Sequence, residues 1–250
     1  MTSKQSIDRH RRAFLRVSGM AALLAFAAQR APALAQARSG GTAMKIGIVG
    51  SGKLGGTVGS RWVKAGHEVL FSSRHPDALK PLVEALGPRA RAGTVREAIA
   101  FGELVLIAVP YGALPQIVRE HAAALSGKIV IDACNPIAAR DGEIAQEAMA
   151  NGIGPTSLKY LAGARLVRAF DPVPYRNFEG DAPRGGEKIG MPVAGDDPEA
   201  VKIASQLARD AGVEPVALPL ARAMDFAPGT PLFGKAFPVS ELRKRLGMTQ

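Results

Sequence analysis

Short apolar runs rich in β-branched residues recur along the chain after residue 43, and amphipathic segments separate them. Strands are expected at Lys45–Val49, Glu68–Ser72, Leu104–Val109, Lys128–Asp132, Leu166–Phe170, Pro192–Ala194 and Pro215–Leu218. Runs that are apolar at nearly every position are typical of strands buried on both faces. The pattern therefore predicts a doubly wound α/β fold with a mainly parallel sheet and a short C-terminal α/β extension.

Helical periodicity lies between these strands. Between the first two strands, apolar residues recur at three- and four-residue spacing, at Leu54, Val58, Trp62 and Ala65. This spacing gives a helix one apolar stripe to lay against the sheet. Further helices are predicted over Pro76–Leu86, Thr94–Phe101 and Asp197–Gly212.

The segment Asp171–Gly190 is rich in proline, glycine and charge, which indicates a long loop or a domain boundary. We divide the chain there into a nucleotide-binding domain, residues 44–170, and a smaller C-terminal segment, residues 171–250, that binds or caps the substrate. The stretch Phe226–Gly247 ends in a predicted amphipathic helix that packs across the site or against a second subunit, which leaves a homodimer open.

Residues 1–37 differ in composition from the rest. A basic head containing RRAFLR (residues 11–16) precedes an apolar stretch over residues 17–28 and then small residues. This order is typical of a secretory signal, and RRAFLR resembles the twin-arginine motif. The segment predicts export to the periplasm by the twin-arginine machinery, with cleavage after Ala35 or Ala37. The alternative is an amphipathic helix or an uncleaved anchor.

The formal net charge of +10 is unevenly distributed, because residues 1–37 hold six basic residues and one acidic residue. The moderate excess that remains, with few aromatic residues, suits an anionic small molecule and argues against a nucleic-acid partner. The single cysteine, Cys134, excludes an internal disulfide and a cysteine-based metal cage, and we predict no metal site.

A glycine turn, Gly50-Ser51-Gly52-Lys53-Leu54-Gly55, directly follows the first predicted strand and opens a helix. Glycines in this G-x-G-x-x-G spacing let the backbone turn tightly and approach a pyrophosphate, which faces the helix N–H groups. In this context the motif predicts a Rossmann-type dinucleotide site. The alternative is a tight turn that binds no ligand.

The end of the second strand indicates which dinucleotide. A carboxylate that would bond the ribose 2′-hydroxyl of NAD is expected about twenty residues after the glycines. The chain has Ser72-Ser73-Arg74 there, and Asp77 lies too late to replace the missing acid. A guanidinium and hydroxyl groups bind phosphate oxygens, so the segment favours NADP(H). The alternative is that Arg74 is a solvated loop residue.

These segments, together with IAVPY (107–111), DACNP (132–136), VRAFDPVPYRNF (167–178) and VAGDD (193–197), resemble the deazaflavin (coenzyme F-420)-dependent NADP reductase family. The similarity spans roughly residues 44–226. It implies that residues 51–54 line the pyrophosphate and that Ser73 and Arg74 hold the 2′-phosphate. It further implies that two strand ends border the nicotinamide, Val109-Pro110-Tyr111 and Asn135-Pro136. The acceptor stays open, because residues 171–178 differ from the best-understood members.

Hydride transfer to a conjugated ring chiefly needs alignment and exclusion of water. Consistent with this, the sequence offers no persuasive acid–base dyad, and Cys134 is expected to be an inert core residue. Candidates for holding an aromatic, anionic acceptor through stacking and charge are Tyr111, Arg168, Phe170 and Tyr175. Ordinary packing is the alternative for each.

The sequence therefore predicts an NADP(H)-dependent oxidoreductase that moves a hydride between the nicotinamide and a ring acceptor such as a deazaflavin or flavin. Two alternatives remain. One is a ferric or flavin reductase of the metalloreductase type, which the sequence also resembles. The other is an exported protein that binds NADP without catalysis.

Overall fold

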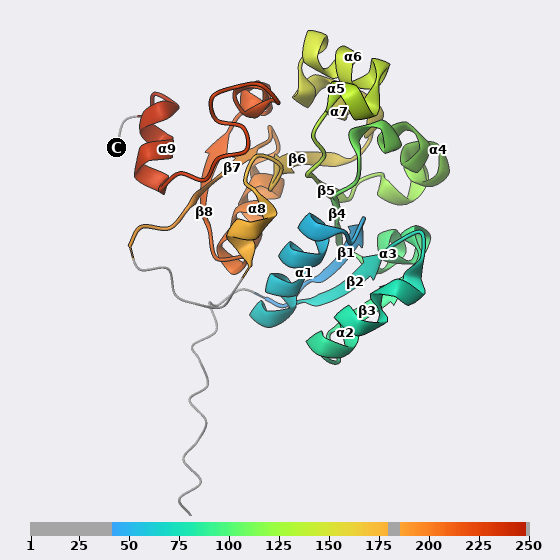
Figure 1. Cartoon of the computed structure of the whole chain (residues 1–250). Helices are drawn as coiled ribbons and strands as arrows, with labels where there is room; N and C mark the ends of the chain where they lie inside the picture. The colour runs from blue at the N-terminus through green and yellow to red at the C-terminus, as the bar shows by residue number, and fades with distance from the viewer. Residues whose placement is uncertain (1–41, 180–185, 249–250) are drawn as a thin grey trace, which may run out of the picture. The chain divides into compact units, whose positions relative to one another are not determined.

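One sheet runs through the computed structural model, which describes residues 42–179 and 186–248; the predicted signal segment, residues 1–37, lies outside these ranges (Figure 1). The strand order is β3-β2-β1-β4-β5-β6-β7-β8. The strands are β1 (Lys45–Val49), β2 (Glu68–Ser72), β3 (Ala90–Gly93), β4 (Leu104–Ile107), β5 (Ile129–Asp132), β6 (Arg165–Ala169), β7 (Gly190–Ala194) and β8 (Glu214–Leu218).

The sheet confirms the predicted doubly wound, mainly parallel arrangement. Strands β1 to β6 pair in parallel, β7 runs antiparallel to β6, and β8 is parallel to β7. Strand β3 was not predicted, because its sequence Ala-Arg-Ala-Gly carries no apolar run. The long connection after β6 allows the chain to reverse, whereas a parallel pair would need a crossover.

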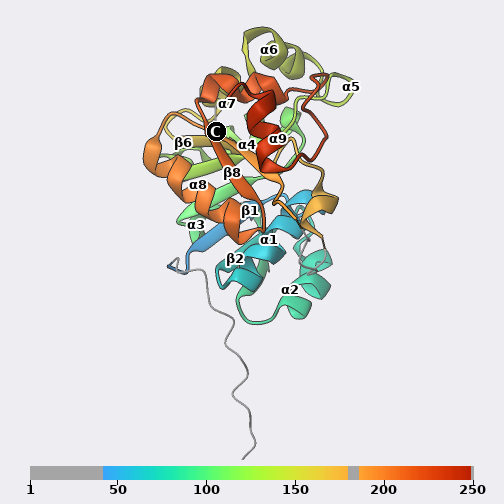
Figure 2. The ribbon, with the colours of Figure 1, turned by 90° about the vertical axis from the view of Figure 1, so that its left-hand side faces the viewer.

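Helices cover both faces of this sheet (Figure 1 and Figure 2). The α-helices of the described residues are α1 (Lys53–Ala65), α2 (Lys80–Leu86), α3 (Val95–Phe101), α4 (Leu114–Leu125), α5 (Ala138–Asp141), α6 (Glu143–Asn151), α7 (Ile153–Tyr160), α8 (Pro198–Asp210) and α9 (Val239–Arg245). Short 3₁₀ helices are η1 (Pro76–Leu79), η2 (Tyr111–Ala113), η3 (Tyr175–Phe178) and η4 (Leu220–Phe226). Within those residues, every helix is too short or too polar to cross a lipid bilayer.

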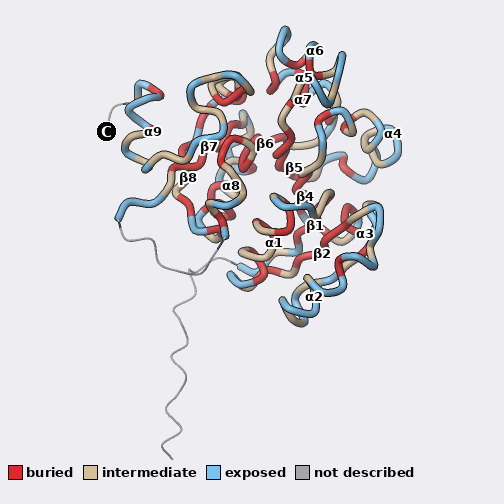
Figure 3. Tube along the Cα trace, viewed as in Figure 1, coloured by how far each residue is buried: buried red, intermediate tan, exposed pale blue. Residues whose placement is uncertain are grey.

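The core lies between the sheet and its two helical layers, where most strand residues outside β3 are buried (Figure 3). On one face, Trp62 of α1 is fully buried and its indole N–H donates to the carbonyl of Leu207 in α8 at 2.8 Å. On the other face, Ile99, Leu114 and Ile153 bring α3, α4 and α7 against the strands. The apolar stripe predicted for α1 therefore docks that helix, which fixes the position of its N-terminus at the glycine turn.

Helix ends follow local sequence signals. Gly66 terminates α1 in the left-handed conformation, with φ of 107°. Thr94 caps α3, and its side chain and that of Glu97 satisfy each other's backbone N–H groups. Asp197 caps α8 by accepting two backbone N–H groups. These caps explain why the predicted helix boundaries agree closely with the structure.

Candidate functional site

The first glycine of the turn is required by the fold itself. Gly50 leaves β1 with φ of 95°, and a Cβ there would lie 2.5 Å from the carbonyl oxygen of Ala108. The turn is tied to the end of β2, because the Ser51 N–H donates to the carbonyl of Ser72 at 3.0 Å. The backbone after β1 is thus held between the ends of β2 and β4.

The second and third glycines have different surroundings. A Cβ at Gly55 would lie 2.2 Å from the carbonyl oxygen of Gly50, so this residue lets α1 begin directly against the turn. At Gly52 nothing lies within 4 Å of the same position, and this residue caps α1 with no side-chain hydrogen bond. The fold does not need a glycine at this position, whereas a phosphate approaching the N–H groups of α1 would.

The three residues predicted to bind the 2′-phosphate, at the end of β2, differ in exposure and in hydrogen-bond partners. Ser72 is fully buried and its hydroxyl donates to the carbonyl of Ile48 at 2.7 Å, so this side chain is used within the sheet and is removed from the predicted set. Ser73 is partly buried and its Oγ accepts the N–H of His75. Arg74 is exposed beyond the strand. Of the three predicted residues, Ser73 and Arg74 therefore keep accessible side chains.

A groove of about 560 Å³ runs beside α1 from the glycine turn. Its lining includes Gly52 and Lys53 at the turn, Leu79 on the η1 side and Tyr175 on the η3 side. The Lys53 ammonium lies 5.5 Å from the centre of the Tyr175 ring. Tyr175 therefore borders an open groove next to the glycine turn. The sequence had instead placed it with the acceptor at the strand ends.

The ends of β4 and β5 form the predicted nicotinamide edge. Val109 is half-buried and Pro110 is exposed, whereas Tyr111 is fully buried with its hydroxyl 3.0 Å from Ser157 Oγ. Tyr111 thus contributes its side chain to the core and cannot stack on a ligand. Asn135 is half-buried and Pro136 is buried.

Asp141 and Arg140 hold the segment after β5 in place through hydrogen bonds. Asp141 accepts the backbone N–H groups of Gly112 and Ile137 at 3.1 and 2.8 Å, and Arg140 donates to the carbonyl of Asn135 at 2.7 Å. Burial alone would raise the pKa of Asp141, but hydrogen bonds from Arg140 and these amides outweigh it and lower that pKa. The segments that follow β4 and β5 are thereby fixed to each other at Gly112 and Ile137.

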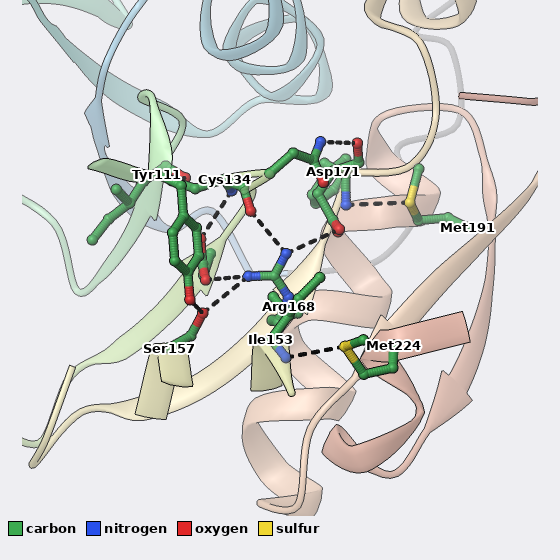
Figure 4. A network of polar contacts seen from close by, with 12 residues as sticks. Tyr111, Cys134, Ile153, Ser157, Arg168, Asp171, Met191 and Met224 are labelled. Carbon is green, nitrogen blue, oxygen red and sulfur yellow. Dashed lines mark hydrogen bonds and ion pairs between the residues drawn. The ribbon is translucent and has the colours of Figure 1, made fainter. Parts of the chain in front are cut away.

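Beneath this edge lies a network around Arg168 of β6 (Figure 4). One guanidinium nitrogen, Nη1, binds Asp132 Oδ2 and lies 3.1 Å from Ser157 Oγ. The other, Nη2, donates to the Cys134 carbonyl at 2.8 Å and to Asp171 Oδ2 at 3.1 Å. In Figure 4, Ser157 and Asp171 lie on different sides of the guanidinium. The network joins η2, α7, β5 and β6 at the carboxyl edge of the sheet.

Burial and charge set the protonation of this network. Burial raises the pKa of Tyr111 and of the Cys134 thiol, so both stay neutral at physiological pH. Burial would lower the pKa of Arg168, but Asp132 and Asp171 raise it and keep the guanidinium charged. The pKa of Asp171 is raised above the ordinary aspartate value, mainly by burial. The Asp132 charge raises it further, and the Arg168 charge offsets only part of the rise.

Arg168 and Phe170 were expected to contact an acceptor, and their positions correct this. The Arg168 side chain is 2% exposed, with its charge paired to carboxylates. Phe170 is fully buried, with its ring centre 5.5 Å from that of Trp62 and 5.9 Å from that of Phe178. Phe170 is also the one non-glycine among the described residues with positive φ, at 70°. These residues shape the turn into Asp171 from inside the protein.

Sequence reasoning missed Asp132, Ser157 and Asp171 as a polar cluster. Asp132 and Arg168 stand at paired positions of neighbouring strands in an otherwise apolar context. A charged residue at corresponding ends of two buried parallel strands is a usable signal, because buried charges are normally paired. Ser157 gave no such signal, since α7 joins the cluster only through tertiary packing.

The fold and the glycine turn define a Rossmann-type dinucleotide-binding protein. Residues 45–136 match the sequence model of a family described as NADP oxidoreductase, coenzyme F420-dependent. This segment contains the glycine turn, the end of β2 and the ends of β4 and β5. Over this segment the chain is similar to NADP-dependent oxidoreductases, and its fold is of the Rossmann type.

Other similarities extend over more of the chain. The metalloreductase STEAP3 of Rattus norvegicus is 29% identical over 181 residues, which is 70% of this chain and 33% of that protein. The chain thus spans about a third of the length of this relative.

Two solved structures share the fold. Protein SMa0349 of Sinorhizobium meliloti has a TM-score of 0.65 at 24% identity, covering 78% of this chain and 95% of that one. A candidate F420-dependent NADP reductase of Arthrobacter sp. FB24 has a TM-score of 0.62 at 20% identity, covering 82% and 96%.

Proposed function

We propose that this protein binds NADP(H) at the glycine turn and transfers a hydride between the nicotinamide and a ring acceptor such as a deazaflavin or flavin. The observation that carries the proposal is that the three glycines of the turn have different surroundings. Gly50 and Gly55 are required by close backbone contacts, whereas Gly52 opens onto free space at an uncapped helix N-terminus. Such an N-terminus stabilises an anion.

The residues present fit the cofactor. Ser51 Oγ is buried without a hydrogen-bond partner beside the glycine turn, and Asn135 Oδ1 is buried without one at the nicotinamide edge. A pyrophosphate accepts hydrogen bonds and a carboxamide donates them, so each orphaned atom has a complementary group in NADP(H). When bound, the cofactor supplies the hydride.

Separate residues of the chain would bind separate parts of the cofactor. The amides from Ser51 to Leu54 would bind the pyrophosphate, and Ser73 and Arg74 the 2′-phosphate. Val109, Pro110 and Asn135 would border the ring and exclude water from it. Tyr175 and Lys53, beside the groove, would contact the cofactor's phosphate end.

Calorimetric titration of NADPH and NADH against the wild type, Arg74→Ala and Arg119→Ala tests the 2′-phosphate role. Arg119 is an exposed arginine of α4 and serves as the matched control. Loss of a charge-assisted contact lowers affinity for NADPH by about 10- to 100-fold in Arg74→Ala. Affinity for NADH stays unchanged. Equal loss for both nucleotides overturns the role of Arg74, and no binding of either overturns the proposed function.

A ferric or flavin reductase is a second candidate, which the similarity to metalloreductase STEAP3 favours. Oxidation of NADPH by the purified protein is followed with a deazaflavin, a flavin and a ferric chelate as separate acceptors. Turnover with a deazaflavin or a flavin but not with the ferric chelate supports the first proposal, and turnover with the ferric chelate supports the second. Tight NADPH binding with no oxidation by any of them supports a binding protein without catalysis.

We also propose that the protein is exported by the twin-arginine machinery, which carries folded proteins. That route would let the chain acquire its nucleotide before it crosses the membrane. The proposal is supported by the order of basic, apolar and small residues over 1–37. Fractionation of cells expressing the wild type and an Arg11→Lys/Arg12→Lys variant tests it, with a periplasmic wild type and a retained variant expected.

A further inference from the structure

One guanidinium serves two carboxylates at the carboxyl edge of the sheet. Arg168 binds Asp132 through Nη1 and Asp171 through Nη2. Tyr111 and Cys134, the other titratable groups that face this cluster, stay neutral. With both carboxylates ionised, the buried cluster therefore carries one excess negative charge. Such a charge is costly away from water, so the cluster is stabilised by a further positive charge.

The geometry distinguishes the two carboxylates. Asp132 is fully buried, and both of its oxygens accept, Oδ1 from the Cys134 N–H at 2.9 Å and Oδ2 from Arg168. Asp171 receives a guanidinium nitrogen at the longer distance of 3.1 Å, and its side chain keeps 8% exposure. Both oxygens of Asp132 are thus already bonded within the protein, and Asp171 is the member that can exchange a proton with the site.

Asp171 also adjoins the proposed nicotinamide edge, because its carbonyl accepts the Asn135 side-chain N–H at 2.7 Å. We propose that Asp171 holds a proton while the nicotinamide ring is uncharged and releases it when the ring is oxidised and positively charged. The oxidised ring then replaces the proton as the second positive charge beside the carboxylate pair. This inference rests on the proposed function and gives the site a proton-holding group that the sequence did not reveal.

The charges and atoms balance across one turnover. NADPH, a ring acceptor and one proton give NADP⁺ and the dihydro form of the acceptor. The hydride carries two electrons from NADPH to the acceptor ring. The proton comes from the Asp171 O–H bond, whose electron pair stays on the carboxylate oxygen. Asp171 takes a new proton from water when NADPH replaces NADP⁺.

Calorimetric binding of NADP⁺ and of NADPH in buffers of different ionisation enthalpy measures the proton directly. In the wild type, we expect NADP⁺ binding to release about one proton more than NADPH binding. The difference disappears in Asp171→Asn. It persists in Asp210→Asn, a buried carboxylate that is paired with His67. Equal release for both nucleotides in the wild type overturns the proposal while leaving the cofactor site intact; failure to bind either nucleotide overturns both.

Unfolding of the protein without cofactor gives an independent readout. A carboxyl with a raised pKa in the folded state contributes stability at low pH that is lost as pH rises through the folded-state value. The unfolding free energy of the wild type relative to Asp171→Asn should therefore fall as pH rises above about 3.9, the ordinary aspartate value. Parallel pH profiles for the two proteins in urea would show that Asp171 never holds the proton.

Discussion

Two arginines at the carboxyl edge of one sheet have opposite surroundings. Arg74 follows β2 and is exposed. Arg168 lies within β6, is 2% exposed, and contacts two carboxylates, a hydroxyl and a carbonyl. Both were predicted to bind ligand, on the same chemical ground. Burial separates them, because a guanidinium whose charge is already paired inside the protein organises strand ends, whereas an exposed one remains available to a phosphate.

The glycine turn and the Arg168 network differ in the same way. The turn presents backbone N–H groups at an uncapped helix start, so it is prepared to receive charge from outside. The network has its own charges and an orphaned Arg168 Nε in the interior. A variant that alters binding without altering stability should therefore be found on the turn, at Gly52, whereas replacement of Arg168 in the network should alter stability.

Replacement of Arg168 gives the largest expected difference. In Arg168→Met two buried carboxylates lose their cation, and the free energy of unfolding should fall by about 3–5 kcal/mol. In Arg74→Met the change should stay within about 0.5 kcal/mol, because the side chain is exposed. Urea denaturation of both variants measures the contrast. A similar loss in both would remove the distinction drawn between the two arginines.

The glycines provide a smaller contrast within the turn itself. In Gly55→Ala the added methyl group would meet the Gly50 carbonyl at 2.2 Å, which should cost about 1–3 kcal/mol of unfolding free energy. In Gly52→Ala the methyl group meets open space, so stability should change by less than about 1 kcal/mol. The same methyl group stands where the phosphate approaches, and we expect NADPH affinity to fall at least about tenfold. Unchanged affinity in Gly52→Ala would place the pyrophosphate elsewhere.

The smallest effect is expected at the rim of the network. Tyr111→Phe removes a buried hydroxyl that lies 3.0 Å from Ser157 Oγ. Ser157 still contacts Arg168, so the loss should be about 0.5–1.5 kcal/mol with unchanged NADPH affinity. Thermal denaturation and NADPH titration of this variant measure the two quantities. A large loss of affinity would mean that the Tyr111 side chain reaches the cofactor despite its burial.

Local signals predicted much of the fold. The strands Lys45–Val49 and Glu68–Ser72 have the predicted bounds, because each is a short apolar run beside a glycine turn or a serine pair. Strand β3 was missed because its sequence, Ala-Arg-Ala-Gly, is partly exposed and has no apolar run. The antiparallel direction of β7 depends on the path of a long connection, and residue patterns do not specify that path.

The site was less predictable than the fold. Backbone requirements at Gly50 and Gly55 are local, so the turn could be inferred from spacing alone. The pairing of Arg168 with Asp132 depends on the register of β5 against β6, which brings together residues 36 positions apart. The burial of Phe170 depends on rings from α1 and η3. Long-range packing decided which polar and aromatic residues face solvent.

The position of Trp62 has a practical consequence. It is the chain's single tryptophan, it is fully buried, and it links α1, α8 and the Phe170 ring. Its fluorescence therefore comes from one place, the junction between the helix that begins at the glycine turn and the strand that leads into Asp171. Loosening of that junction should shift the indole emission to longer wavelength, so the protein carries an intrinsic optical reporter that needs no label.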